Sequence, residues 1–309
     1  MTSLLEVSTH WPRQVSLADL QDALGLTDRE MRRYGRGFGL SEICWDDTMP
    51  EKDILLAALD KLSLLRGQED RVRYVIRPRT QRSPSPYPDS VLQQVRREAG
   101  LGHARTFAVT EHACASGLFA IDLAGMLLAE DEDPDALALV LVGEKAYSRV
   151  AHHLLGMGVT GEATSAVLVS SGGPRDRVLG FAVRTAAVGE PSMVMSEEGG
   201  AAFRELYGDV LVETVGAALA DAGTAMGDVS LVLPHNVNRV AWVRMADRLG
   251  VPVDRIFLDN IPRTGHCFGA DPFLNYATVR ELGRLNPGDR YVMISVGLGA
   301  SFAALVVEH

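Results

Sequence analysis

The chain has 309 residues, is 47% hydrophobic and carries a formal net charge of −10. This composition is typical of a globular protein with one large core or two fused half-domains. The acidic balance excludes a general nucleic-acid binder, since a polyphosphate partner requires positive charge. No apolar run is long enough to span a bilayer, and residues 1–11 lack the pattern of a signal peptide, so we expect no membrane partner.

The cysteines indicate the compartment. Cys44, Cys114 and Cys267 are the only three, they are widely separated, and none belongs to a CxxC pair. Such spacing builds neither a disulfide framework nor a zinc site. We therefore predict a cytoplasmic protein without a metal site.

The first half of the chain alternates short helices with apolar strands. Helices are predicted over residues 17–24, 28–34, 53–65, 90–99 and 118–130. Strands are predicted over residues 73–78, 106–110, 136–142, 165–170 and 178–185. The continuous apolar runs among these strands are typical of buried β-structure, and we expect residues 106–110 to be buried as well.

The second half repeats this alternation. Helices are predicted over residues 200–223, 239–249 and 273–284, and strands over 229–233, 256–258, 290–296 and 301–307. Alternating helices and buried strands predict a layered α/β fold. No linker rich in Gly, Ser or Pro separates the halves, so we expect one compact unit.

Two charged runs interrupt the pattern. Arginines stand at positions 71, 73, 77, 79 and 82, and an acidic run covers residues 130–135. The arginines have the charge to bind phosphate, but charge runs are usually solvated faces. We favour an exposed strand end whose arginines pair with surface carboxylates, and we expect the acidic run to be a solvated loop.

Cys114 lies between a predicted strand and a predicted helix, in the sequence Glu-His-Ala-Cys-Ala-Ser-Gly. The free N–H groups and the dipole at a helix N-terminus favour an anion, so a thiolate is stabilised there. The alternative is a small buried hydrophobic residue, which is what most free cysteines are. The segment alone leaves both interpretations open.

A histidine follows a strand in the second half. His235 stands in Pro-His-Asn-Val-Asn after residues 231–233, at a strand C-terminus where α/β proteins commonly bind ligands. Together with Cys114, Gly143-Glu144, Gly161-Glu162-Ala163 and Gly297-Leu298-Gly299, it resembles the thiolase superfamily, in particular ketoacyl-ACP synthase III. Residues 28–40 and the Pro-rich segment 83–89 also resemble that family, and the similarity covers roughly residues 17–309.

The resemblance implies a five-layered α-β-α-β-α fold of two similar halves, here residues 1–172 and 173–309, and a homodimer. It implies no tightly bound cofactor, with a coenzyme A or phosphopantetheine thioester as substrate and acyl-CoA or an acyl carrier protein as partner. By position, Cys114 matches the family nucleophile and His235 its catalytic histidine. The oxyanion hole is expected from the N–H of Cys114 with one from Leu298 or Gly299.

The sequence departs from the family at the third catalytic position. The family has an asparagine in a Gly-Asn-Thr/Ser turn, whereas this chain has His266. A histidine is a poorer match for condensation but can act as a base near neutral pH. Asp271 lies five residues later, before Pro272. We expect it to cap the next helix, and the alternative is that it orients a histidine as the acid of a triad.

The resemblance also suggests substrate-binding residues. Asn238 matches an asparagine that contacts the pantetheine arm, although a helix cap is the alternative. Arg239 and Phe268 are the other candidates. The predicted helix 239–249 also carries two further arginines, at 244 and 248, which either meet phosphates or a carrier protein at the pocket mouth or form ordinary surface pairs.

Three functional hypotheses result. The first is an acyltransferase that uses acyl-Cys114 to acylate a hydroxyl or amine acceptor of small-molecule type, in secondary metabolism. The second is decarboxylative carbon–carbon condensation, which the His266 substitution places behind the first. The third is a non-catalytic partner in a heterodimeric synthase, which the retention of Cys114 and His235 disfavours.

Overall fold

The computed structural model of the protein describes residues 1–81, 90–154, 156–186 and 195–309. Among these residues the strands form one nine-stranded mixed sheet and a two-stranded ribbon. In spatial order the large sheet contains β5 (Arg105–Val109), β4 (Val72–Pro78), β6 (Leu137–Val142), β7 (Thr164–Ser170), β1 (Ser3–His10), β8 (Arg177–Thr185), β11 (Ser301–Glu308), β10 (Arg290–Gly297) and β9 (Val229–Leu233).

The large sheet is effectively two sheets joined at one corner. β1 pairs with β7 over most of its length, but it pairs with β8 only through Ser3 and Arg177. Within the large sheet, β1 and β4 to β7 therefore belong to one half, and β8 to β11 belong to the other. The predicted division between residues 172 and 173 lies in the connection from β7 to β8.

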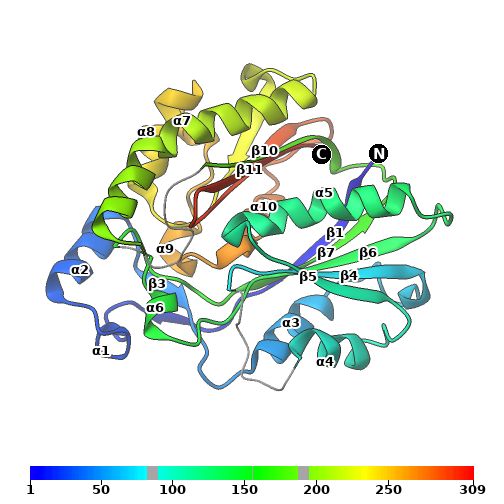
Figure 1. Ribbon diagram of the computed structural model, residues 1–309, viewed down its shortest axis with the longest axis horizontal. Coiled ribbons are helices and arrows are strands. Elements are labelled where there is room, and N and C mark those ends of the chain that lie inside the picture. The colour runs from blue at the N-terminus through cyan, green and yellow to red at the C-terminus, as the bar shows by residue number, and fades with distance from the viewer. Residues whose placement is uncertain (82–89, 155, 187–194) are drawn as a thin grey trace.

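Helices complete the five layers that were predicted (Figure 1). The outer side of the first half is covered by α3 (Glu51–Leu59) and α4 (Val91–Glu98), and that of the second by α7 (Glu197–Asp221) and α8 (Arg239–Leu249). Between the two halves lie α5 (Ser116–Ala129) and α10 (Asp271–Glu281), whose apolar side chains share one core cluster with both. The α-β-α-β-α prediction is confirmed.

The N-terminal segment packs on the second half. The remaining elements are β2 (Gln14–Ser16), β3 (Glu42–Cys44), α1 (Gln21–Leu24), α2 (Asp28–Arg32), a π-helix (Arg33–Gly37), α6 (Arg149–His152) and α9 (Ile261–Thr264). Leu24, Tyr34 and Ile43 are buried in the same cluster as Trp242 of α8. Residues of the N-terminal segment thus complete the core of the C-terminal half, and Arg33 and Phe38 line the same pocket as Cys114.

Three details of the sequence prediction are wrong. The expected buried strand 106–110 is β5, which lies at the sheet edge and is only partly buried. Residues 256–258 form no strand, and Ile256 makes a single bridge to Val232. The strand β1 was missed because its burial runs in pairs around a bulge between Leu4 and Glu6, so the two-residue period is lost.

The arginine run pairs with carboxylates, as favoured. Arg71 and Arg73 bind Asp135 and Asp133 of the acidic run. Further along β4, however, the pairing is internal: Arg77 lies 2.7 Å from Glu51, and both side chains are almost completely buried. The expectation of an exposed strand end is therefore wrong for Arg77. Residue 82 and the Pro-rich segment 83–89 lie outside the described residues.

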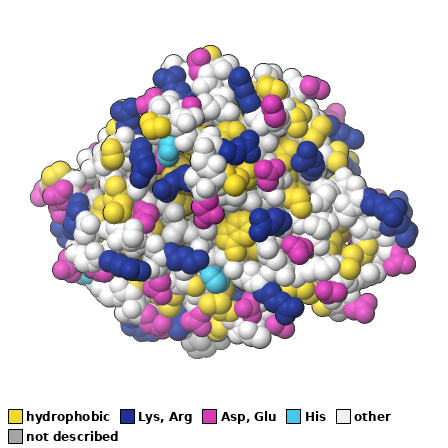
Figure 2. All heavy atoms as spheres, turned by 180° about the vertical axis from the view of Figure 1, so that it is seen from behind, with side chains coloured by type: hydrophobic (Ala, Val, Ile, Leu, Met, Phe, Trp, Pro, Cys, Tyr) yellow, Lys and Arg dark blue, Asp and Glu magenta, His cyan; other side chains and the backbone are white. Residues whose placement is uncertain are grey.

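Surface charges of both signs are interspersed on the face opposite to that of Figure 1 (Figure 2). Among the described residues, no helix combines the length and apolar character that a membrane crossing needs.

Candidate active site

Cys114 lies where the sequence predicted, in a tight turn at the start of a helix. A 3₁₀ turn over Ala113–Ala115 leads directly into α5. Glu111 and Ala113 both have positive φ angles, 67° and 47°, which are uncommon for residues with a side chain. The turn places Cys114 in the central layer, where it is only 2% exposed and lines a pocket.

The end of β10 supports this turn. The hydroxyl of Ser295 donates to the carbonyl of Cys114 at 2.9 Å. A Cβ at Gly297 would lie 2.2 Å from the carbonyl oxygen of His112 and 3.1 Å from the amide nitrogen of Cys114. The backbone of β10 therefore approaches the turn as closely as a glycine permits.

We expect Gly297→Ala to displace the Cys114 turn. The clash is with backbone, so relief requires a backbone shift that costs about 1–3 kcal/mol and slows acylation of Cys114. Urea denaturation and the rate of acyl adduct formation measure the two effects. Gly216→Ala is the matched control, because Gly216 lies in α7 with nothing near its added Cβ. Equal stability and equal acylation rate in both variants would contradict the inferred constraint.

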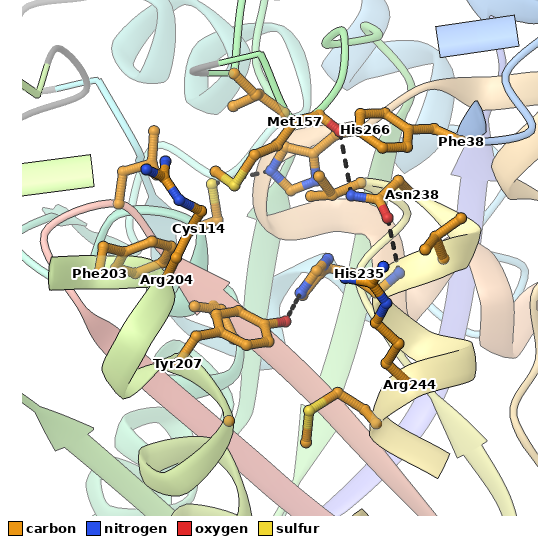
Figure 3. A pocket seen from close by; sticks show the side chains of 18 of the residues that line it. Phe38, Cys114, Met157, Phe203, Arg204, Tyr207, His235, Asn238, Arg244 and His266 are labelled. Atoms are coloured by element: carbon orange, nitrogen blue, oxygen red, sulfur yellow. Dashed lines mark hydrogen bonds between the residues drawn. The ribbon is translucent and has the colours of Figure 1, made fainter. Parts of the chain in front are cut away.

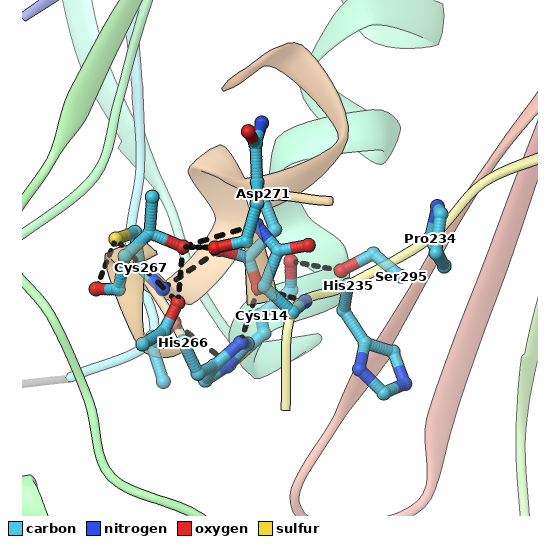
Figure 4. A network of polar contacts seen from close by, with 12 residues as sticks. Cys114, Pro234, His235, His266, Cys267, Asp271 and Ser295 are labelled. Atoms are coloured by element: carbon cyan, nitrogen blue, oxygen red, sulfur yellow. Dashed lines mark hydrogen bonds and ion pairs between the residues drawn. The ribbon is translucent and has the colours of Figure 1, made fainter. Parts of the chain in front are cut away.

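His266 links Cys114 to Asp271 (Figure 4). Its Nε2 lies 3.1 Å from the Cys114 Sγ, and its Nδ1 lies 2.5 Å from Asp271 Oδ2. The carboxylate is held by two further bonds, from the amides of Asn236 at 2.6 Å and Cys267 at 2.7 Å. Thiol, imidazole and carboxylate thus form one continuous hydrogen-bonded relay.

The charge state of His266 follows from this relay. Burial alone lowers the pKa of an imidazole, but the adjacent Asp271 carboxylate and the Cys114 sulfur outweigh it and raise the pKa of His266 to about 10. The resting site therefore favours an imidazolium beside the Asp271 carboxylate.

Asp271 does not cap α10, so the cap expectation is wrong. The N-cap position is Ala270, and no side chain caps that end. The carboxylate is turned instead toward His266 and two backbone amides that precede the helix. Asp271 is the first residue of α10 and not the residue before it. Its carboxylate therefore accepts hydrogen bonds from these groups instead of capping the helix.

His235 has a different partner. It follows β9, and its Nε2 lies 2.9 Å from the hydroxyl of Tyr207, which comes from α7. Figure 3 shows this hydroxyl pointing at the imidazole ring. Burial and the nearby positive His266 lower the pKa of His235 to about 3. His235 is thus neutral, and its ring centre lies 6.1 Å from that of His266.

The pocket that contains these groups has a volume of about 490 Å³. Cys114, His235 and His266 all line it, and residues of α7 and α8 form much of its wall. Four arginines also line it: Arg33, Arg204, Arg244 and Arg248. Arg248 pairs with Asp209, whereas the described residues offer no ion pair to Arg204 or Arg244.

The structure places one of the three predicted binding residues at the pocket. Asn238 lines the pocket and also caps α8, accepting from the amide of Ala241 at 2.8 Å. Arg239 is exposed and does not line the pocket. Phe268 is buried in a separate cluster with Ala146 and Ala151. The geometry therefore gives no direct substrate contact to Arg239 or Phe268.

Two of the three predicted oxyanion residues, Cys114 and Leu298, line the pocket. Leu298 lines the cavity, and Gly299 has a φ of 95° that favours glycine. The residue before them, Gly297, approaches the Cys114 amide closely, because a Cβ there would lie 3.1 Å from its nitrogen. The assignment of Leu298 and Gly299 as oxyanion donors stays a prediction.

Known proteins resemble this architecture. The family described as 3-oxoacyl-[acyl-carrier-protein] synthase III C terminal matches residues 219–309. A beta-ketoacyl-[acyl-carrier-protein] synthase III from Rhodobacter capsulatus is 29% identical over 68% of this chain and 70% of its own length. The same enzyme from Nitratidesulfovibrio vulgaris is 36% identical over 29% of this chain and 27% of its own.

Solved structures match the whole fold. ChlB3, an acyltransferase, superposes with a TM-score of 0.84 over 99% of this chain and 97% of its own, at 19% identity. The 3-oxoacyl-[acyl-carrier-protein] synthase III of Aquifex aeolicus gives 0.80 over the full length of both chains, at 17% identity. The chain is thus similar to ketoacyl-ACP synthase III in sequence, most clearly over residues 219–309, and in fold over its whole length.

Sequence reasoning missed two polar residues of this ketoacyl-ACP synthase III-like site. Thr80 donates its hydroxyl to the Cys114 Sγ at 3.4 Å, and its amide donates to the buried Glu144. Tyr207 binds His235 from the long helix α7. Neither stands in a recognisable motif, and both approach the site only through tertiary packing.

Proposed function

We propose that the protein is an acyltransferase that carries an acyl group on Cys114. The donor is acyl-CoA or an acyl carrier protein, and the acceptor is a hydroxyl or amine of a small molecule. The observation that carries this proposal is the continuous relay of Cys114, His266 and Asp271. It has the nucleophile, base and orienting acid that heteroatom acyl transfer requires.

The two half-reactions balance within this relay. The Cys114 thiolate attacks the donor thioester, the carbon–sulfur bond to the carrier breaks, and the released thiolate takes the proton of the His266 imidazolium. The acceptor then attacks the acyl-cysteine while neutral His266 removes its proton. Asp271 stabilises the imidazolium formed again at that step. The bond between the acyl carbon and the Cys114 sulfur breaks, and the sulfur is released as a thiolate beside this imidazolium.

The arginines of the pocket support a phosphate-bearing donor. Arg204 and Arg244 line the cavity without a carboxylate partner among the described residues. Guanidinium groups bind phosphates well, and both coenzyme A and phosphopantetheine carry them.

Decarboxylative condensation is the second candidate. It is favoured by the relatives matched in sequence, which are beta-ketoacyl-[acyl-carrier-protein] synthases. In that reaction His266 would have to donate to an enolate oxygen. The pairing of its other nitrogen with Asp271 suits proton transfer better, and we place condensation second for that reason. A homodimer and a role in secondary metabolism stay predictions.

The reaction class can be tested in two steps. Intact-protein mass spectrometry after incubation with a series of acyl-CoA and acyl-carrier donors is expected to show one added acyl group. Malonyl-CoA is then added and released CO2 is measured. We expect no CO2 release coupled to product. Stoichiometric release with product formation would establish condensation and refute our proposal, and the absence of any adduct would refute both candidates.

A further inference from the structure

The hydrogen bond between Tyr207 and His235 affects which second substrate the site can accept. The His235 side chain is almost completely buried, and its Nε2 is 2.9 Å from the Tyr207 hydroxyl. Its other ring nitrogen, Nδ1, is buried without a hydrogen-bond partner among the described residues. The tyrosine is therefore the polar contact that determines what this imidazole presents to the pocket.

Both tautomers of neutral His235 lead to the same result. If Nε2 carries the proton, it donates to the Tyr207 oxygen and has no second proton to give. If Nδ1 carries the proton, Nε2 accepts from the Tyr207 hydroxyl and is not a donor at all. The low pKa of His235, which burial causes, excludes the doubly protonated form near neutral pH. His235 thus donates no hydrogen bond from Nε2 to a bound substrate.

The two candidate second substrates differ in what they need here. Decarboxylation of a malonyl thioester leaves an enolate, whose oxygen charge must be stabilised by hydrogen-bond donors. An acceptor hydroxyl or amine carries a proton as well as a lone pair, so it matches a group that both donates and accepts. A tyrosine hydroxyl is such a group, whereas a single imidazole nitrogen is not.

We propose that Tyr207 is a specificity-determining residue that engages His235 and so withholds its Nε2 donor from an enolate, which directs acyl-Cys114 toward heteroatom acceptors. The proposal rests on the acyltransferase function proposed above. Tyr207 is well placed for this role because it lines the same pocket as Cys114, His235 and His266. Its ring is fixed edge-on against Phe203 and Phe302, with centroid distances of 5.8 and 5.7 Å.

Removing the hydroxyl tests the proposal. Tyr207→Phe keeps the ring packing and frees Nε2 of His235. With malonyl-CoA as the probe, we expect this variant to release CO2 at least about tenfold faster than the wild type. The double variant Tyr207→Phe/His235→Ala is expected to lose the gain, because the freed donor is then absent. A merely structural effect of Tyr207 would not depend on His235.

Tyr276→Phe is the matched control. It also removes a buried tyrosine hydroxyl, here one that binds Asp176 at 2.5 Å outside the pocket, and is expected to release CO2 like the wild type. Should Tyr207→Phe fail to fold by circular dichroism, Tyr207→Leu is expected to show the same gain. A wild-type rate of CO2 release in the folded variant, or a gain that persists without His235, overturns the role of Tyr207. Coupled CO2 release by the wild type instead overturns the proposed function.

Discussion

Cys114→Ala is expected to form no acyl adduct with any donor that acylates the wild type. The Cys114 sulfur is the group that the proposed mechanism acylates, so kcat/KM for transfer should fall by roughly 10⁴-fold or more. Intact mass measurement and a single-turnover assay detect the two losses. The fold should persist, because an alanine fits the space of the thiol.

The control uses another buried cysteine. Cys44 is completely buried in the central core and does not line the pocket, so Cys44→Ala should keep the adduct at a modest cost in stability. An undiminished adduct in Cys114→Ala would show that a different residue carries the acyl group. The mechanism proposed for the relay would then be wrong.

Asp271→Asn is expected to lower the rate of acyl transfer by about 10³-fold or more. The amide cannot stabilise the His266 imidazolium, and its NH2 group has to face at least one of the three donors that now bind the carboxylate. Removing this negative charge also lowers the pKa of His266 from about 10 toward its ordinary value. The variant should therefore reach its plateau of transfer at lower pH than the wild type.

The same charge pair predicts how stability depends on pH. The folded pKa of His266 lies above the ordinary value of 6.5, so the pair stabilises the fold fully below pH 6.5. That contribution is lost as the pH rises through about 10. Urea denaturation from pH 6 to 10 should show a steeper loss of unfolding free energy in the wild type than in Asp271→Asn.

Asp259→Asn is the control for both measurements. Asp259 is an exposed aspartate that pairs with Arg284 at 3.6 Å, away from the pocket, so its loss should change neither profile. Identical pH profiles for the wild type and Asp271→Asn would contradict the ion pair with His266.

Local patterns were sufficient for most of the fold. The apolar runs of β6, β7, β10 and β11 predict buried strands because every residue of a central strand is covered on both faces. The strand β1 was not predicted, because its bulge interrupts the two-residue alternation of buried and exposed side chains on which such predictions depend. Likewise, residues 256–258 are apolar because they are buried, yet their burial is achieved without a ladder.

The sequence by itself determined which residues stand at element ends, and hence that Cys114 begins a helix and His235 follows a strand. These positions depend on neighbours a few residues away, and local composition records them. Only the tertiary structure decided what the polar groups contact. Asp271 had two local options, a cap or a triad, and the side-chain direction that chose between them is set by the packing of α10 against the turn of His266.

Contacts between residues far apart in the sequence could not be predicted from local patterns. Tyr207 and His235 are 28 residues apart, and Cys114 and His266 are 152 apart. A buried hydrogen-bonding group must find a partner, but which partner is nearest depends on how the two halves close on one another. The sequence therefore predicted an acyl-carrying cysteine. The packing of the two halves determines that Cys114 contacts His266, that His266 contacts Asp271, and that His235 contacts Tyr207.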